Sequence, residues 1–322
     1  MSSPRLTVVL CAHNPREKPF RRVLASLVGQ TLRQPAWELV VVDNASVPPL
    51  EPVLESLAPE TLTRRVVTEP RLGLTAARCA GILAALGEEI VFVDDDTVLD
   101  ADYLERAAEL LRGESHVGAS GGKIAGEFEV PPKKWMVEAL GNLALRDFGD
   151  RPIRALIYDQ PGPWEPCGAG MVIRTSIART YASRILQGGG HRSDRVGRGL
   201  SSGGDTELAR TACDLGAYLA YEPTLRLTHL IPKERLTLWY LARISYNVQR
   251  DGWLLPRRKG PENRLSWRRY VAGCLAVPVR TICGSPRRWI LRMAAEFGRL
   301  RGTRVLLESA LSATNAKEAR AG

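Results

Sequence analysis

Three consecutive aspartates, Asp94, Asp95 and Asp96, directly follow the apolar run Ile90–Val93 and could bind a cation. An apolar run of this kind predicts a buried parallel strand. In an open α/β sheet, ligands bind outside the carboxyl ends of such strands. Mg²⁺ and Mn²⁺ prefer oxygen ligands and often bridge protein carboxylates to substrate phosphates. The pattern therefore predicts a metal and phosphate site; the alternative is a solvated acidic turn in which Asp96 or Asp100 caps the next helix.

Two further carboxylates stand at the ends of predicted elements. The apolar strand 38–42 runs into Asp43, which is followed by turn-forming residues that include Asn44. A carboxylate here could accept hydrogen bonds from a ligand; the alternative is an Asx turn with Asn44. Asp205 precedes a predicted helix at 206–215, where the positive end of the helix dipole keeps a carboxylate ionised. Its alternative role is that of a helix N-cap.

These carboxylates belong to a chain in which strands and helices alternate. The predicted elements of this part are strands at 6–11, 38–43, 65–68 and 90–93, and helices at 20–30, 50–57 and 74–86. The alternation predicts a parallel sheet covered by helices on both faces, with a nucleotide at the switch point of the strand order.

The character of the chain changes after Gly118, where glycine clusters and short apolar pieces predict a mixed, partly antiparallel second half. The glycine-rich stretch 187–204 lacks apolar periodicity and is predicted to be a mobile loop that acts as a lid. Residues 218–221 are predicted to form an edge strand. We expect three regions, at 1–125, 126–232 and 233–322, of which the last is basic and helical.

Composition indicates a globular protein in a reducing compartment. Its 322 residues are 44% hydrophobic and 25% charged, which suits one large domain with an appendage, or two domains. Six cysteines without a C-x-x-C pair argue against a structural zinc site and a disulfide framework. We see no signal-peptide pattern and no apolar run long enough to span a bilayer. These features predict a cytoplasmic protein.

The net charge of +10 comes from one segment, because residues 252–304 contain 13 basic and two acidic residues while the remainder has 32 basic and 33 acidic ones. On a helix, Trp289, Met293, Phe297 and Leu300 would share one face flanked by arginines, as in an interfacial membrane helix. The segment thus predicts binding to an anionic membrane surface. The alternatives are packing on the body or on a second subunit. Nucleic-acid binding is not expected, because no recognised motif is present.

Seven short motifs, spread in order over about the first 235 residues, resemble those of the inverting family 2 glycosyltransferases. They are Val8–Asn14, Val41–Ser46, Gly73–Arg78, Asp94–Asp96, Gly168–Met171, Gly204–Leu208 and His229–Pro232. One Asp-x-Asp motif alone carries little weight, whereas seven in order are specific. The resemblance implies an α/β protein of GT-A fold, in which a Rossmann-like nucleotide-binding sheet continues into a mixed sheet. It makes 1–125 the nucleotide-sugar-binding half and 126–232 the acceptor-binding half. A basic C-terminal helical appendage at 233–322 follows, outside the resemblance.

The resemblance also implies which residues bind the donor and the metal. The implied donor-binding residues are Ala12, His13, Asn14, Asp43, Arg71, Arg78, Asp94, Asp95 and Gly170. Asp96 would bind Mn²⁺ or Mg²⁺ directly, with His229 as a further ligand, and the metal would neutralise charge on the departing diphosphate. Two of these residues have alternative roles without a ligand: His229 on its own would be structural, and Arg71 would be a solvated surface charge.

On the acceptor side, the resemblance makes Asp205 the general base that takes the proton of the acceptor hydroxyl. The family usually has an acidic residue where this chain has Gly204. Glu207 would bind acceptor or orient the loop, unless it lies on a solvated helix face. Trp164 could stack on a sugar ring, although a core tryptophan is the commoner explanation.

These features predict a metal-dependent, inverting glycosyltransferase of the hexosyltransferase type (EC 2.4). It would move a sugar from a nucleoside diphosphate sugar, UDP-sugar being favoured, to a hydroxyl of a lipid-linked or cell-surface glycan, as in polysaccharide biosynthesis. The alternatives are a sugar-phosphate nucleotidyltransferase and a non-catalytic nucleotide-binding protein. The basic tail would hold a cytoplasmic enzyme at the inner face of the membrane, and a homo-oligomer is compatible with the sequence.

Overall fold

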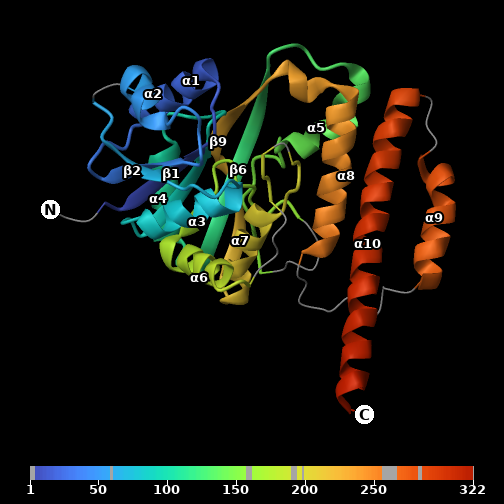
Figure 1. Ribbon diagram of the computed structural model, residues 1–322. Coiled ribbons are helices and arrows are strands. Elements are labelled where there is room, and N and C mark those ends of the chain that lie inside the picture. The colour runs from blue at the N-terminus through green and yellow to red at the C-terminus, as the bar shows by residue number, and fades with distance from the viewer. Residues whose placement is uncertain are drawn as a thin grey trace. The chain divides into compact units, whose positions relative to one another are not determined.

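The computed structural model describes residues 4–58, 61–156, 162–189, 194–197, 199–255, 267–281 and 285–321. The chain divides into two compact units. Unit 1 comprises Met1–Glu129, Ala144–Gly199 and Gly204–Ile231, and unit 2 comprises Val130–Leu143, Leu200–Gly203 and Pro232–Gly322. The strands of the described chain all lie in unit 1, where they form one nine-stranded sheet (Figure 1).

Unit 1 begins with four parallel strands in the order β3-β2-β1-β4. They are β1 (Leu6–Ala12), β2 (Trp37–Asp43), β3 (Arg64–Thr68) and β4 (Glu89–Asp94). The helices between and after them are α1 (Glu17–Val28), α2 (Leu50–Leu57), α3 (Leu74–Ala84) and α4 (Tyr103–Gly113). Every residue of β1 is buried, as expected for a strand that helices cover on both faces. The predicted alternation of strands and helices is confirmed.

Successive residues of a strand point to opposite faces of the sheet, so β1 contributes to two separate cores. On one face, Val8 packs in a cluster with residues of α1, α2 and α4, such as Phe20. On the other face, Val9 packs with residues of α3, α6 (Thr175–Leu186) and α7 (Gly204–Asp214). Two helical layers therefore enclose the sheet (Figure 1).

Beyond β4 the sheet becomes mixed, as predicted. The remaining strands are β5 (Thr97–Leu99), β6 (Val117–Phe128), β7 (Ile153–Ala155), β8 (Val172–Arg174) and β9 (Tyr218–Ile231). Strand β8 runs antiparallel to both β4 and β6, β6 is parallel to β9, and β9 pairs antiparallel with β5 and β7. Because β5 pairs with residues 227–229, this arrangement sets the end of β4 near the C-terminal end of β9.

The prediction of an edge strand at 218–221 is wrong. Those residues begin β9, a 14-residue strand that pairs with β6, β5 and β7. A local apolar segment could not reveal this length, because Pro223 interrupts the pattern. The ladder accommodates the proline in a bulge, where Gly121 pairs with Tyr221 but Lys123 pairs with Arg226.

Unit 2 is helical. Its longer helices are α8 (Leu238–Leu254), α9 (Trp267–Thr281) and α10 (Pro286–Ala321), and its short elements are η1 (Lys134–Met136), α5 (Val137–Leu140), η2 (Gly141–Leu143) and η3 (Lys233–Leu236). Helix α10 packs along α8 and α9 (Figure 1). None of the helices in the described part is long and apolar enough to cross a bilayer.

Two predictions fall partly outside the described residues. Of the predicted lid at 187–204, residues 190–193 and 198 lie outside them. Of the basic tail, 256–266 and 282–284 lie outside them. The predicted shared face of α10 is divided in the structure, because Leu300 is buried whereas Trp289 and Phe297 are exposed.

Candidate active site

The carboxyl ends of β1, β2 and β4 bring the first predicted residues to one edge of the sheet. Ala12 lies beside Asp43 in the β1–β2 register, and Cys11 lies beside Asp94 in the β1–β4 register. The ends of neighbouring parallel strands meet at the same edge, which is where open α/β sheets bind ligands. Residues from three separate motifs therefore meet, as the sequence predicts.

The loop after β1 is fastened to the loop after β2. The Nδ1 atom of His13 lies 2.7 Å from the carbonyl oxygen of Asn44. Asn14 has a φ of 46°, a left-handed conformation that asparagine tolerates. Its N–H donates to the hydroxyl of Ser46 at 3.1 Å, and its side-chain oxygen accepts from the N–H of Val47 at 2.8 Å. The first loop is thus held beside Asp43, the residue predicted to contact the nucleotide.

Asp43 is 4% exposed, and both of its carboxylate oxygens accept backbone hydrogen bonds. The N–H of Ser46 donates to Oδ1 at 3.0 Å, and the N–H of Leu50, the first residue of α2, donates to Oδ2 at 2.9 Å. Asp43 therefore stabilises the turn after β2, as the alternative prediction has it, but its partners are Ser46 and Leu50 instead of Asn44. Each carboxylate oxygen has two lone pairs, so these bonds leave capacity for a base.

Asn44 ties the segment before α3 to the end of β2. Its side-chain nitrogen donates to the carbonyl oxygens of Glu69 at 3.0 Å and Arg71 at 2.8 Å, and its oxygen accepts from the N–H of Gly73 at 2.8 Å. The guanidinium of Arg71 is bound to the Glu69 carboxylate, and this hydrogen bond lowers the pKa of Glu69. The Arg71 side chain is 66% exposed, so its contact with a donor stays a prediction.

Arg78, in contrast, is 4% exposed and lies among carboxylates. Burial alone would lower the pKa of its guanidinium, but attraction to Asp194, Asp205 and Asp94 raises it. The guanidinium also lies 5.9 Å from the ring centroid of Phe92, within the range of a cation–π contact. This one cation therefore interacts with Asp94, on the predicted donor side, and with Asp205, the predicted base.

The aspartate triad forms a tight turn between β4 and β5. The hydroxyl of Thr97 accepts from the N–H of Asp94 at 3.1 Å and donates to its carbonyl oxygen at 3.0 Å. The carbonyl oxygen of Asp96 accepts from the N–H of Leu230 at 2.8 Å. Strand β5 pairs with β9 so that Thr97 lies opposite His229. As a result, the Nε2 atom of His229 lies 3.3 Å from a carboxylate oxygen of Asp96.

This pair suits a divalent cation that also binds a diphosphate. The described residues contain no group of three or more histidine, cysteine, aspartate or glutamate side chains placed to hold a metal. Asp96 and His229 provide one oxygen and one nitrogen ligand, and Mg²⁺ commonly takes only one or two protein carboxylates and obtains its other ligands from phosphates and water. Burial raises the pKa of the neighbouring Asp94, an effect that Arg78 opposes. The residues present therefore fit the predicted metal.

Asp205 lies in the first turn of α7, which begins at Gly204, two residues before the predicted start at 206; Asp205 is therefore inside the helix and is not its N-cap. One of its carboxylate oxygens accepts from the N–H of Gly168 at 2.9 Å, and the other accepts from the N–H of Thr206 at 2.8 Å. Gly170 has a φ of 73° and donates to the carbonyl oxygen of Phe92 at 3.0 Å. The segment 168–170 is therefore bonded on one side to β4 and on the other to Asp205. These contacts place the predicted base next to the strand that ends in the aspartate triad.

The two predicted acceptor residues differ in exposure. Glu207 is 4% exposed, so the alternative that it lies on a solvated helix face is wrong. Trp164 is half-buried and packs against the core cluster formed with α3, α6 and α7, which fits the core-tryptophan explanation for part of its ring. Acceptor binding by either residue stays a prediction.

Sequence reasoning missed several charged or polar residues that surround the site. Asp194 lies 3.6 Å from Arg78 and accepts from the hydroxyl of Thr75 at 3.0 Å. Glu165 forms a buried ion pair with Arg210 at 2.5 Å; burial raises the pKa of Glu165, and Arg210 opposes the shift. Asp194, Glu165 and Arg210 belong to none of the seven motifs, so only their proximity in the fold reveals them.

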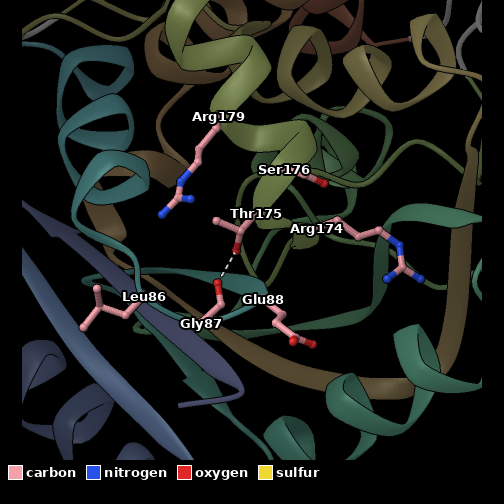
Figure 2. A pocket seen from close by; sticks show the side chains of 7 residues that line it. All are labelled: Leu86, Gly87, Glu88, Arg174, Thr175, Ser176 and Arg179. Atoms are coloured by element: carbon pink, nitrogen blue, oxygen red, sulfur yellow. Dashed lines mark hydrogen bonds between the residues drawn. The ribbon is translucent and has the colours of Figure 1, made fainter. Parts of the chain in front are cut away.

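A separate surface pocket lies at the opposite edge of the sheet. Its walls are Leu86, Gly87, Glu88, Arg174, Thr175, Ser176 and Arg179, and the hydroxyl of Thr175 donates to the carbonyl oxygen of Gly87 at 2.7 Å (Figure 2). The pocket adjoins the start of β4, whereas the aspartate triad follows its end. A strand of six residues spans roughly 17–20 Å at about 3.3 Å per residue, so this pocket is distinct from the candidate active site.

Comparison with known proteins identifies the family. The model of glycosyl transferase family 2 matches residues 7–181, more than half of the chain. The chain belongs to glycosyl transferase family 2. The succinoglycan biosynthesis protein ExoM of Rhizobium meliloti (strain 1021) is 22% identical to this glycosyltransferase over 260 residues, which cover 80% of this chain and 78% of ExoM.

Solved structures show the same fold. The crystal structure of S. aureus TarS matches this glycosyltransferase with a TM-score of 0.50 and 15% identity, covering 92% of this chain and 55% of TarS. The structure of TarS 1–349 in complex with UDP matches with a TM-score of 0.50 and 16% identity, covering 96% and 92%. The predicted GT-A fold is thereby confirmed.

Family membership makes the protein a transferase of class EC 2.4 and sets aside the nucleotidyltransferase and the non-catalytic binding protein. The span matched by the family model contains Asp43, Arg78 and the aspartate triad but ends before Asp205 and His229. The fold of this glycosyltransferase brings those two later residues to the site through α7 and β9.

Proposed function

We propose that this family 2 glycosyltransferase transfers a hexose from a UDP-sugar to a hydroxyl of a glycan acceptor, with inversion and with a divalent metal. The observation that carries the proposal is the position of Arg78, a buried guanidinium that attracts both Asp94 and Asp205. The name of ExoM, a succinoglycan biosynthesis protein, supports a polysaccharide product. The UDP in the TarS 1–349 structure supports the nucleotide.

On the donor side, Asp43 receives the imide N–H of uracil while its backbone partners hold the carboxylate in place. Ala12, His13 and Asn14 flank the base. Asp94 and Asp95 bind the ribose, and the buried guanidinium of Arg78 attracts the diphosphate. Arginine suits this task because its charge is permanent and its donors are arranged as a fork.

Asp96 and His229 would hold the Mn²⁺ or Mg²⁺ ion, and Gly170 lets the backbone pass close to the donor sugar. When bound, the ion supplies Lewis-acid stabilisation of the charge on the leaving diphosphate. Arg78 adds to the same stabilisation from the protein.

Asp205 acts as the general base at the acceptor. Its carboxylate takes the proton of the attacking hydroxyl as that oxygen forms a bond to the anomeric carbon. The bond from that carbon to the diphosphate oxygen breaks on the opposite side, and its electron pair leaves with UDP. The configuration inverts because attack and departure occur on opposite faces. Glu207 and Trp164 help to place the acceptor.

The test of this mechanism is Asp205→Asn, with Asp214→Asn at the exposed end of the same helix as the matched control. We expect the first variant to lose transfer by about 10²–10⁴-fold, the usual contribution of a general base, while keeping metal-dependent UDP binding in calorimetry. The control should keep both. Transfer at the wild-type rate by Asp205→Asn would remove Asp205 from the role of base.

Donor and metal are tested together in a hydrolysis screen. UDP-, GDP- and dTDP-sugars are each incubated with Mn²⁺, Mg²⁺ or EDTA, and release of the nucleoside diphosphate is measured. We expect release from UDP-sugars with metal and little release with EDTA. Equal release with EDTA would contradict the role given to Asp96 and His229, and preference for a GDP-sugar would contradict the role of Asp43.

For the basic tail we propose contact with an anionic membrane surface. Helix α9 exposes Leu275 (76%) and Val271 (51%), and α10 exposes Trp289. Apolar side chains between basic residues suit the boundary of a charged bilayer.

The test is sedimentation of the protein with phosphatidylserine vesicles, which should fall with added salt. It should also fall in the double variant Val271→Ser/Leu275→Ser. It should not fall in the control Leu83→Ser, which changes an exposed residue of α3 in unit 1. Equal sedimentation of both variants would contradict the proposal.

A further inference from the structure

Residue 204, the first of α7, has no side chain, and another residue fills the space where that side chain would be. A Cβ atom built on Gly204 would lie 2.4 Å from a carboxylate oxygen of Asp194 and 3.0 Å from the hydroxyl of Thr75. A real Cβ does not approach an oxygen this closely, so the Asp194 carboxylate occupies the volume that a side chain at 204 would take. The backbone of Gly204 is helical rather than left-handed and would accept any residue.

Asp194 is itself firmly held in this place. Its side chain is 7% exposed. The hydroxyl of Thr75, in α3, donates to Oδ2 at 3.0 Å, and the N–H of Arg195 donates to Oδ1 at 2.8 Å. Burial raises the pKa of the Asp194 carboxyl, and Arg78 opposes this shift. A buried carboxylate persists in a fold only with such partners.

The main positively charged partner of Asp194 is Arg78. Asp194 Oδ2 lies 3.6 Å from Nη1 of Arg78, an ion-pair distance that is too long for a hydrogen bond. Nη1 is buried and has no hydrogen-bond partner among the residues that the structure describes, so Asp194 attracts the guanidinium without saturating it. Nη2 of the same guanidinium borders Gly168, whose N–H donates to Asp205. Arg78 therefore keeps a donor for a ligand while its position is fixed from one side.

We propose that Asp194 is a positioning residue, a carboxylate supplied by the glycine-rich segment in place of one at residue 204, which holds Arg78 beside Gly168 and near Asp205. This proposal rests on the function proposed above for Arg78 in binding the donor diphosphate. Asp194 does not touch the reacting atoms. Its effect passes through the guanidinium, so it should govern affinity for the diphosphate.

The test moves the carboxylate from one position to the other. Asp194→Gly removes it, Gly204→Asp adds a second carboxylate against the first, and the double variant Asp194→Gly/Gly204→Asp restores a single one. For each chain, the dissociation constant of UDP is measured by calorimetry with Mn²⁺, and transfer and the melting temperature are measured alongside. Asp194→Asn, which keeps the volume but not the charge, separates packing from electrostatics.

We expect each single variant to bind UDP at least about tenfold more weakly, the effect of losing or crowding one charge partner near a phosphate site. The double variant should recover most of this loss, and Asp194→Asn should resemble Asp194→Gly. The proposal is overturned if the double variant binds UDP no more tightly than Asp194→Gly does. If Asp194→Gly fails to fold, the proposal is overturned when the double variant fails to fold as well. Unchanged UDP affinity in Asp194→Gly also overturns it. Because UDP binding does not need the base, failure of the Asp205 test leaves this result interpretable.

Discussion

Replacing Asp43 by asparagine tests whether one carboxylate both holds the local backbone and reads the nucleotide. Its two oxygens accept from the N–H groups of Ser46 and Leu50 at 3.0 and 2.9 Å in a buried setting. Asparagine keeps one acceptor oxygen but turns an NH₂ group toward the other N–H, which cannot pair with it. The variant also loses the negative charge near the first turn of α2.

The size of the effect follows from these contacts. A hydrogen bond to a charged group contributes about 1.5–3 kcal/mol, and a buried donor left without a partner costs about 1–3 kcal/mol. We therefore expect Asp43→Asn to lower the free energy of unfolding by about 2.5–6 kcal/mol, the sum of the two effects, in urea denaturation followed by tryptophan fluorescence. The control is Asp150→Asn, because that carboxylate is almost fully exposed, and it should change stability by less than about 0.5 kcal/mol.

The same variant should lose selectivity for uracil. Where Asp43→Asn is still folded, its affinity for UDP should fall toward its affinity for GDP. Unfolding at the wild-type urea concentration would refute the backbone role, and unchanged preference for UDP would refute the reading of the base. The two readouts fail independently, so each half of the reasoning has its own test.

Two further predictions concern the core and the thiols. Gly122→Ala should destabilise the protein by at least about 2 kcal/mol, because its Cβ would lie 1.8 Å from a backbone oxygen of the β9 bulge. Gly113→Ala, which meets nothing within 4 Å, should be neutral or slightly stabilising; equal effects of the two in urea denaturation would contradict this. Burial raises the pKa of the Cys11 thiol to about 12, so iodoacetamide at pH 8 should modify exposed Cys274 well before Cys11, as mass spectrometry would show. Rapid alkylation of native Cys11 would contradict its burial.

The parallel half of the fold could be predicted from the sequence because its signals are local. The run Leu6–Ala12 is apolar throughout and fully buried, and the helix predicted at 50–57 has those bounds in the structure. Strand β9 could not be predicted as one strand, because Pro223 breaks the local pattern. Only its pairing with β6, in which a bulge absorbs the extra residues, makes it continuous.

The candidate site shows the same division between local and long-range information. Strand-end residues such as Asp43 and Asp94 meet because parallel strands end at one edge, which the strand pattern already implies. The Asp96–His229 pair depends on the register of β5 against β9, two strands separated by more than 100 residues. That register cannot be read from either segment alone, so the pairing rested on the resemblance until the fold supplied the geometry.

Asp194 marks the limit of motif reasoning, since a motif assigns a chemical role to a fixed place in the chain. The absence of an acid at Gly204 reads as a lost function if only position is compared. In the folded chain the relevant quantity is where a carboxylate stands relative to Arg78, and a residue ten positions earlier meets that requirement at 3.6 Å. Holding Arg78 requires a carboxylate at this place in the fold, but any segment of the chain can supply that carboxylate. A glycine at 204 is then the consequence of a carboxylate already present, because a second side chain would have no room there.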